Sequence, residues 1–126
     1  MKTIFMFLFI LTTHYTKSFA QINNSVMEIS DIEIKNGWIT LFDSNSKKIS
    51  QMPQLKNEIV GIAGNFFVVT NNGWIITYDE RCKKIEQMAQ SGKQVKAAVG
   101  STFTVFSNGW IITYDKKCKE KSKRPK

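Results

Sequence analysis

The stretch Asn108-Gly109-Trp110-Ile111-Ile112-Thr113-Tyr114-Asp115 decides the fold, because the same eight residues also occur at positions 72–79. A looser copy, NGWITLFD, occupies positions 36–43, so each copy begins 36 residues after the previous one. A fixed period of about 20–50 residues is typical of repeat architectures, in which one supersecondary unit cannot bury its apolar face alone. The sequence therefore predicts three tandem units, at about 24–57, 58–93 and 94–122.

Each unit reads as a series of short β-strands. Asn72-Gly73 lies between apolar stretches, and Asn-Gly is the strongest short hairpin signal because both central residues of a type I′ turn need positive φ. The residues from Trp74 onward are aromatic or β-branched, which favours a strand, and Asp79 opens a polar turn. The expected strands are 58–63, 66–71, 74–79 and 83–89 in the second unit, and 94–99, 102–107 and 110–115 in the third.

The first unit departs from this pattern. Residues 29–35 stand where the second strand of the unit belongs, and a full innermost strand is not evident. Asp31 and Glu33 fall where Phe67 and Val69 lie in the next unit. We expect a one-residue slip in register here, because such a slip reverses which side chains face inward.

The C-terminal stretch after Asp115 holds seven basic residues and one acidic residue. Ile85 and Met88 of the second unit are matched there by Lys121 and Arg124. Short blocks of like charge are usually disordered and solvated. We therefore expect the fourth strand to be lost in the third unit, and residues 119–126 to form a basic disordered tail.

The N-terminus has the pattern of a secretory signal peptide. Lys2 supplies a positive charge, residues 4–11 form an unbroken apolar run, and Ser18-Phe19-Ala20 offers a small-residue cleavage site. The run is shorter than the roughly 20 residues of a membrane span. We expect removal of residues 1–20 and an exported chain, secreted or periplasmic, whose three-unit β domain covers 21–118; a buried N-terminal helix or strand is the alternative.

Cys82 and Cys118 occupy the same place in successive units, where the first unit has Ser46. Exported proteins meet oxidising conditions, which favours a disulfide between the two. A bridge needs Cα atoms about 4.4–6.8 Å apart. Equivalent positions approach that closely in a solenoid but lie further apart on the outer rim of neighbouring propeller blades. A disulfide and two free thiols are therefore both compatible with the sequence.

The unit resembles a β-propeller blade. It has four short strands, an apolar inner pair, a hairpin, an aromatic strand ending in Tyr-Asp or Phe-Asp, and a Lys-Lys-Ile outer strand, and the resemblance covers residues 26–122. The chain is also similar to small exported bacterial proteins with Trp-Ile-x-Thr-Tyr-Asp and Lys-Lys-Ile repeats. The resemblance implies an all-β fold of three tandem blade-like antiparallel β-meander repeats, a partial propeller.

Propeller rings usually contain 4–8 blades, and well-known blades run to about 40–45 residues, so three short units do not fill a ring. Two arrangements follow. Either the chain forms an open or compact three-unit meander, or two chains complete a six-bladed ring as a homodimer, which would remove exposed sheet edges.

The candidate ligand-binding residues are aromatic: Trp38, Trp74, Trp110, Tyr78 and Tyr114. Aromatic faces in repeated blades can stack on sugar rings. The other reading is packing, because Trp74, Ile76 and Tyr78 share one face of a strand that neighbouring units would cover. We expect packing for the tryptophans, with the sugar platform as the alternative.

The sequence offers little support for an enzyme. Asp43, Asp79 and Asp115 recur once per unit at the same turn, where capping of the turn is expected. Paired catalytic carboxylates would have to converge to about 5–9.5 Å. The only histidine, His14, lies within the signal peptide, so a nucleophile has no histidine base after export. We expect no cofactor and no metal site.

Three function classes remain: a non-enzymatic protein-interaction module with an unknown partner, a lectin-like glycan binder with sites between repeats, and a hydrolase. We favour the first. The basic tail also suggests weak contact with an anionic surface, since clustered cations bind phosphate groups by releasing counterions. It lacks interleaved aromatic residues, so a nucleic acid is not an expected partner.

Overall fold

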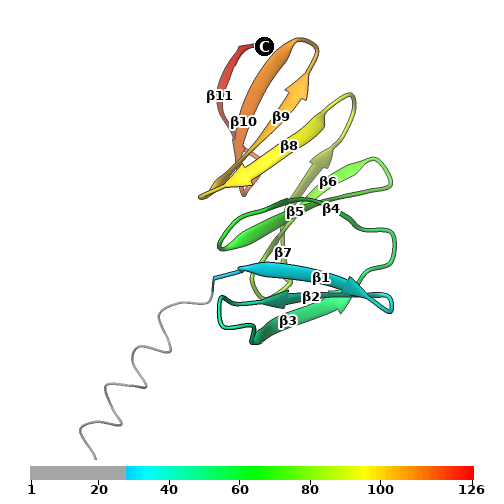
Figure 1. Cartoon of the computed structure of the whole chain (residues 1–126). Coiled ribbons are helices and arrows are strands. Elements are labelled where there is room, and N and C mark those ends of the chain that lie inside the picture. The colour runs from blue at the N-terminus through cyan, green and yellow to red at the C-terminus, as the bar shows by residue number, and fades with distance from the viewer. Residues whose placement is uncertain (1–27) are drawn as a thin grey trace, which may run out of the picture.

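The computed structural model describes residues 28–126, which form three antiparallel sheets stacked in chain order (Figure 1). The all-β repeat fold expected from the sequence is confirmed, whereas the predicted signal peptide lies outside the described residues. Within residues 28–126, no helix is long and apolar enough to cross a membrane.

Sheet 1 has the strand order β1-β2-β3, sheet 2 the order β4-β5-β6-β7, and sheet 3 the order β8-β9-β10-β11. The strand bounds are Asp31–Lys35 (β1), Trp38–Phe42 (β2), Lys48–Pro53 (β3), Glu58–Ile62 (β4), Phe66–Asn71 (β5), Trp74–Asp79 (β6), Lys84–Ala89 (β7), Gln94–Val99 (β8), Thr102–Ser107 (β9), Trp110–Asp115 (β10) and Glu120–Pro125 (β11).

Two kinds of turn build every sheet. The Asn-Gly hairpins have positive φ at both central residues, with 54° at Asn72 and 87° at Gly73, which is the backbone of a type I′ turn. The second turn begins at Asp79, whose Oδ1 accepts the backbone N–H groups of Arg81 at 2.8 Å and Lys83 at 2.9 Å. Asp43 and Asp115 accept the equivalent pairs, so the capping role expected for these aspartates is confirmed.

Sheet 2 is apolar on both faces because β5 lies between two other sheets. Phe66 and Val68 pack into a cluster with residues of sheet 3, whereas Phe67 and Val69 pack into a second cluster with residues of sheet 1. All four side chains are fully buried. Burial on both faces gives a continuous apolar run in place of an alternating pattern, which explains the Phe-Phe-Val-Val sequence.

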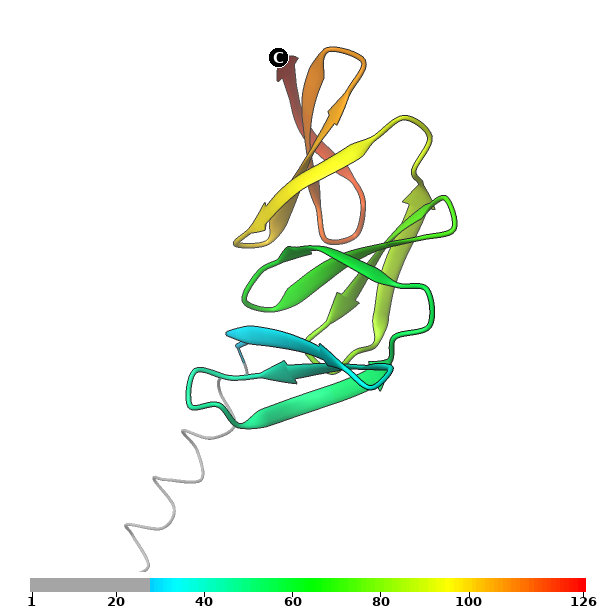
Figure 2. The ribbon, with the colours of Figure 1, turned by 45° about the vertical axis from the view of Figure 1, so that its right-hand side comes forward.

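The stack is directional. We call the face of sheet 2 that carries Phe67, Ile76 and Tyr78 its front face, the face that carries Phe66, Val68 and Ile75 its back face, and the equivalent faces of the other sheets likewise. We call the contact between two neighbouring sheets a joint. At each of the two joints, the back face of one sheet packs against the front face of the next. The sheets do not close into a propeller, so the front face of sheet 1 and the back face of sheet 3 have no sheet against them among the described residues (Figures 1 and 2).

The register slip expected in the first unit is wrong. Asp31 pairs with Phe42, just as Phe67 pairs with Tyr78 in sheet 2. Asp31 and Glu33 therefore stand on the front face of sheet 1. No described sheet packs there, so these carboxylates stay exposed and the pairing has no reason to shift.

The expectation of a lost fourth strand and a disordered tail at 119–126 is also wrong. β11 pairs with β10 from Trp110↔Pro125 to Tyr114↔Glu120. Strand pairing joins backbone groups, and the outer edge of β10 offers N–H and C=O groups that need partners. Every side chain of β11 is exposed, so its cationic groups remain in water while the backbone pairs.

Candidate functional site

One exposed tryptophan begins the third strand of each unit, directly after the hairpin. Trp38, Trp74 and Trp110 are 43%, 43% and 39% exposed and belong to neither apolar cluster. The expectation that they pack between the sheets is therefore wrong. Trp38 has no described sheet in front of it yet is no more exposed than Trp74, so the partial cover of each indole comes from its own sheet.

The neighbours of this tryptophan series differ between its two sides. On the outer strand, the residue paired with each tryptophan is apolar: Pro53, Ala89 and Pro125. On the inner strand, the paired residue is polar: Lys35, Asn71 and Ser107. In addition, the Nζ atom of Lys123 lies 4.7 Å from the ring centroid of Trp110.

The two tyrosines proposed as ligand-binding residues lie at the joints. Tyr78 stacks on Phe67 with ring centroids 5.4 Å apart, and Tyr114 stacks on Phe103 at 5.6 Å. Burial raises the pKa of both phenols above their ordinary value. Four residues of strand, about 13 Å, separate Tyr78 from Trp74, so the structure does not gather the tyrosines and tryptophans into one site.

Cys82 and Cys118 are free thiols. Cys82 packs against the cluster between sheets 1 and 2, and Cys118 against the cluster between sheets 2 and 3. The disulfide left open by the sequence is therefore not formed, because sheet 2 lies between the two joints. Burial raises the pKa of Cys82 and raises that of Cys118 to about 11, so both thiols are neutral and weakly nucleophilic at pH 7.

A hydroxyl group closes each joint by donating to the turn of the next sheet. Ser50 Oγ donates to the carbonyl of Glu80 at 2.7 Å, and Thr77 Oγ1 donates to the carbonyl of Lys116 at 2.7 Å. Glu80 and Lys116 are equivalent residues, each directly after the turn aspartate. The hydroxyls stand on paired positions of the back face, since Thr77 pairs with Glu86, the equivalent of Ser50.

The front face of sheet 1 carries an acidic hollow of about 320 Å³. Its lining residues are Ser30, Asp31, Glu33, Phe42, Asp43, Ser44 and Ser46. Three of these are carboxylates and none is basic. The Asp43 carboxylate is engaged in its own turn, so the free side-chain charge of this hollow comes from Asp31 and Glu33 and is negative.

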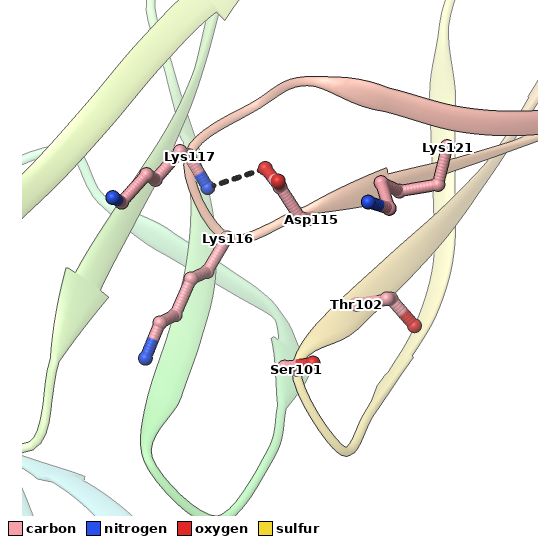
Figure 3. Close-up of a pocket in the computed structure, with 6 residues that line it drawn as sticks. All are labelled: Ser101, Thr102, Asp115, Lys116, Lys117 and Lys121. Carbon is pink, nitrogen blue, oxygen red and sulfur yellow. Dashed lines mark hydrogen bonds between the residues drawn. The ribbon is translucent and has the colours of Figure 1, made fainter.

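The third sheet carries a basic hollow of about 290 Å³ (Figure 3). Lys116, Lys117 and Lys121 line it together with Ser101, Thr102 and Asp115. The backbone N–H groups of Lys119 and Lys117 hold the pKa of Asp115 below its ordinary value, and the carboxylate is engaged in its own turn. The free side-chain charge of this hollow is therefore positive.

None of the residues predicted as site residues from the sequence lies in the linings of these two end surfaces. Their signal was nevertheless visible, because charged residues replace apolar ones at matched repeat positions. We interpreted Asp31 and Glu33 as a register slip, and Lys121 and Arg124 as a decayed strand.

No protein-family model matches the chain, and no curated protein matches it. Within residues 28–126, no group of three or more His, Cys, Asp or Glu side chains is arranged to hold a metal ion.

Proposed function

We propose that the chain is an exported, non-enzymatic interaction module that binds a protein partner through the tryptophan series. The observation that carries this proposal is the exposure of Trp38, Trp74 and Trp110 at equivalent positions, each beside an apolar residue of the outer strand. The proposal of export depends on the N-terminal sequence pattern.

Exposed indoles of this kind suit a protein interface. Tryptophan is enriched at the centres of protein–protein interfaces, where truncation of a hot-spot residue costs about 2 kcal/mol or more. Pro53 and Pro125 extend the apolar surface of Trp38 and Trp110 on the outer side. Three equivalent anchors on one chain also favour avidity, because the second and third contacts become intramolecular.

A lectin-like glycan binder is the second candidate. The polar inner neighbours Lys35, Asn71 and Ser107 favour it, because a sugar stacked on an indole needs nearby groups for its hydroxyls. Two observations favour the protein partner over the sugar. The outer neighbours offer no side-chain hydrogen bond, and Lys123 already lies over the ring of Trp110.

We assign no reaction to the chain. The aspartates at the turns lie one per sheet, and the Oδ1 atom of each accepts two backbone N–H groups. These carboxylates serve the fold of the turns, and the two thiols are protonated at neutral pH.

The test uses single, double and triple Trp→Ala variants of Trp38, Trp74 and Trp110, with Leu55→Ala as the control. Leu55 is 81% exposed and lies outside the series, so its change removes an exposed apolar side chain elsewhere. The protein is cross-linked in an extract of the cell envelope and culture medium, and the cross-linked residues are mapped by mass spectrometry. In parallel, the same proteins are applied to a glycan array.

We expect cross-links near the three hairpins, captured protein that falls stepwise as tryptophans are removed, and no change with Leu55→Ala. Binding to glycans that disappears in the Trp→Ala variants would favour the lectin. Capture that survives the triple substitution would show that the series is not the binding surface.

A further inference from the structure

We propose that the two ends of the stack bind each other in separate copies of this chain, so that the back face of sheet 3 in one copy docks on the front face of sheet 1 in the next. This inference is independent of what the tryptophan series binds. It arises from the directional stack, because both internal joints are back-to-front contacts and the described chain ends with one free back face and one free front face.

The free back face is basic where the internal back face is apolar. Val60, Ile85 and Met88 of sheet 2 pack against the cluster at the joint with sheet 3. Their equivalents in sheet 3, one period later, are Lys96, Lys121 and Arg124. An apolar contact has thus been replaced by three cations at the positions that meet the next sheet inside the chain.

The free front face is acidic where the internal front faces are apolar. Phe67 and Val69 fill the joint in front of sheet 2, and their equivalents in sheet 1 are Asp31 and Glu33. Both line the acidic hollow. Strand pairing also places two lysines on this face, Lys35 on β1 and Lys48 opposite Phe42 on β3. Lys35 lies at the hairpin end of β1, and neither lysine lines the hollow.

The replacements match each other across the proposed contact. Phe67 and Val69 share a cluster with Ile49 and Met52, which are the sheet 1 equivalents of Ile85 and Met88. Docking a second copy in the same geometry would therefore bring Asp31 and Glu33 to the region of Lys121 and Arg124. Complementary charge of this kind steers association and excludes the wrong pairing of like ends.

The hydroxyl bonds of the joints are also available at the ends. Sheet 3 carries both hydroxyls of the internal joints on one cross-strand pair, Thr113 in the place of Thr77 and Ser122 in the place of Ser50. The equivalent acceptor at the other end is the carbonyl of Ser44, which lies in the lining of the acidic hollow. The ends thus repeat the donor and acceptor positions of the joints.

Two simpler interpretations explain fewer features of the two end faces. End repeats commonly have polar outer faces that keep a stack soluble, but a solubility cap does not need opposite charge at the two ends or matched hydroxyl positions. An anionic surface would satisfy the basic end but not the acidic hollow. A second copy satisfies both ends, and a contact between unlike ends gives a ring if it closes and a filament if it does not.

The test measures the mass of the full-length protein, after whatever processing its N-terminus receives in the cell, by sedimentation over a wide range of protein and salt concentrations. We expect the mass to rise from one chain to two or more with protein concentration, and to fall back as salt screens the end charges. Two variants change one end each: Asp31→Lys with Glu33→Lys, and Lys121→Glu with Arg124→Glu.

Each variant alone is expected to remain monomeric at concentrations where the wild type associates. An equimolar mixture regains association, because a contact between the two variants again places opposite charges at positions 31 and 33 of one copy and at positions 121 and 124 of the other. The control for the second variant, Lys56→Glu with Arg81→Glu, makes the same change in net charge as Lys121→Glu with Arg124→Glu, at exposed positions away from both end faces, and associates like the wild type. Circular dichroism of each variant establishes that it is folded.

A wild type that stays monomeric at every concentration overturns the proposal and leaves the charged ends as solubility caps. The proposal is also overturned if the mixture of folded variants fails to associate. It is overturned as well if only one of the two variants loses association, because a contact between two like ends would be disrupted by changing that end alone. A monomer whose basic end binds vesicles of anionic lipid would show that the occupant is a membrane surface and not a second copy.

Discussion

At the scale of single residues, the same type of side chain has different hydrogen-bond partners at a joint and at an end of the stack. Thr77 is fully buried, and its hydroxyl donates to the carbonyl of Lys116. Thr113 occupies the equivalent position in sheet 3, between Thr104 and Ser122, but stands on the free back face, where no described residue accepts its hydroxyl. Thr77 Oγ1 also accepts the backbone N–H of Glu86 in its own sheet at 3.2 Å, so the difference between the two threonines measures the joint together with that bond.

We predict that Thr77→Val lowers the free energy of unfolding by about 1–2 kcal/mol, because it leaves a partly buried carbonyl without its donor. Thr113→Val in the equivalent strand position should change it by less than about 0.5 kcal/mol, because this half-buried hydroxyl has no hydrogen-bond partner among the described residues. Urea unfolding at protein concentrations low enough to keep the chain monomeric measures both. Equal losses in the two variants would mean that the hydroxyl acts within its own sheet and not across the joint.

At the scale of the element, the conformation of the turns could be predicted from the sequence, whereas the pairing of the terminal strands could not. Asn-Gly and the turn aspartates act over a few residues, so their conformation is encoded where they stand. β11 forms because the edge of β10 offers backbone partners, which is a property of a neighbouring strand. The charges of Lys121 and Arg124 concealed this strand because side-chain chemistry is uninformative where every side chain is exposed.

We predict that deletion of residues 119–126 lowers the melting temperature by about 4–8 °C, because it removes the β10–β11 ladder and a loss of about 1 kcal/mol shifts a domain of this size by that amount. A full-length variant with Lys121, Lys123 and Arg124 all changed to Gln keeps the backbone ladder and should melt close to the wild type. Calorimetry of both proteins makes the comparison. A truncated chain that melts like the wild type would show that β11 contributes nothing to stability.

At the scale of the whole molecule, the repeat period predicted the number of units but not how they are arranged. An apolar run such as Phe66-Phe67-Val68-Val69 shows that both faces of β5 are covered, and this holds equally in a closed ring and an open stack. The tryptophans were misjudged for a related reason. A large aromatic side chain favours burial between sheets. These three tryptophans, however, stand at the hairpin end of their strands, where they stay about 40% exposed.

The two adjacent phenylalanines of β5 give a final prediction, because they face opposite joints. Phe66→Leu reduces contacts with sheet 3, and Phe67→Leu reduces contacts with sheet 1, each at a cost of about 1–3 kcal/mol. In a stack whose units touch only their neighbours, the free energy of unfolding is close to the sum of the stabilities of the units and of the contacts between neighbours. Each substitution should therefore destabilise the sheet on one side of sheet 2. Hydrogen exchange of backbone amides should show lost protection mainly in β8–β11 for Phe66→Leu and mainly in β1–β3 for Phe67→Leu. Equal loss at both ends in both variants would instead mean that the three sheets unfold as one cooperative unit, in which the joints are as strong as the sheets themselves.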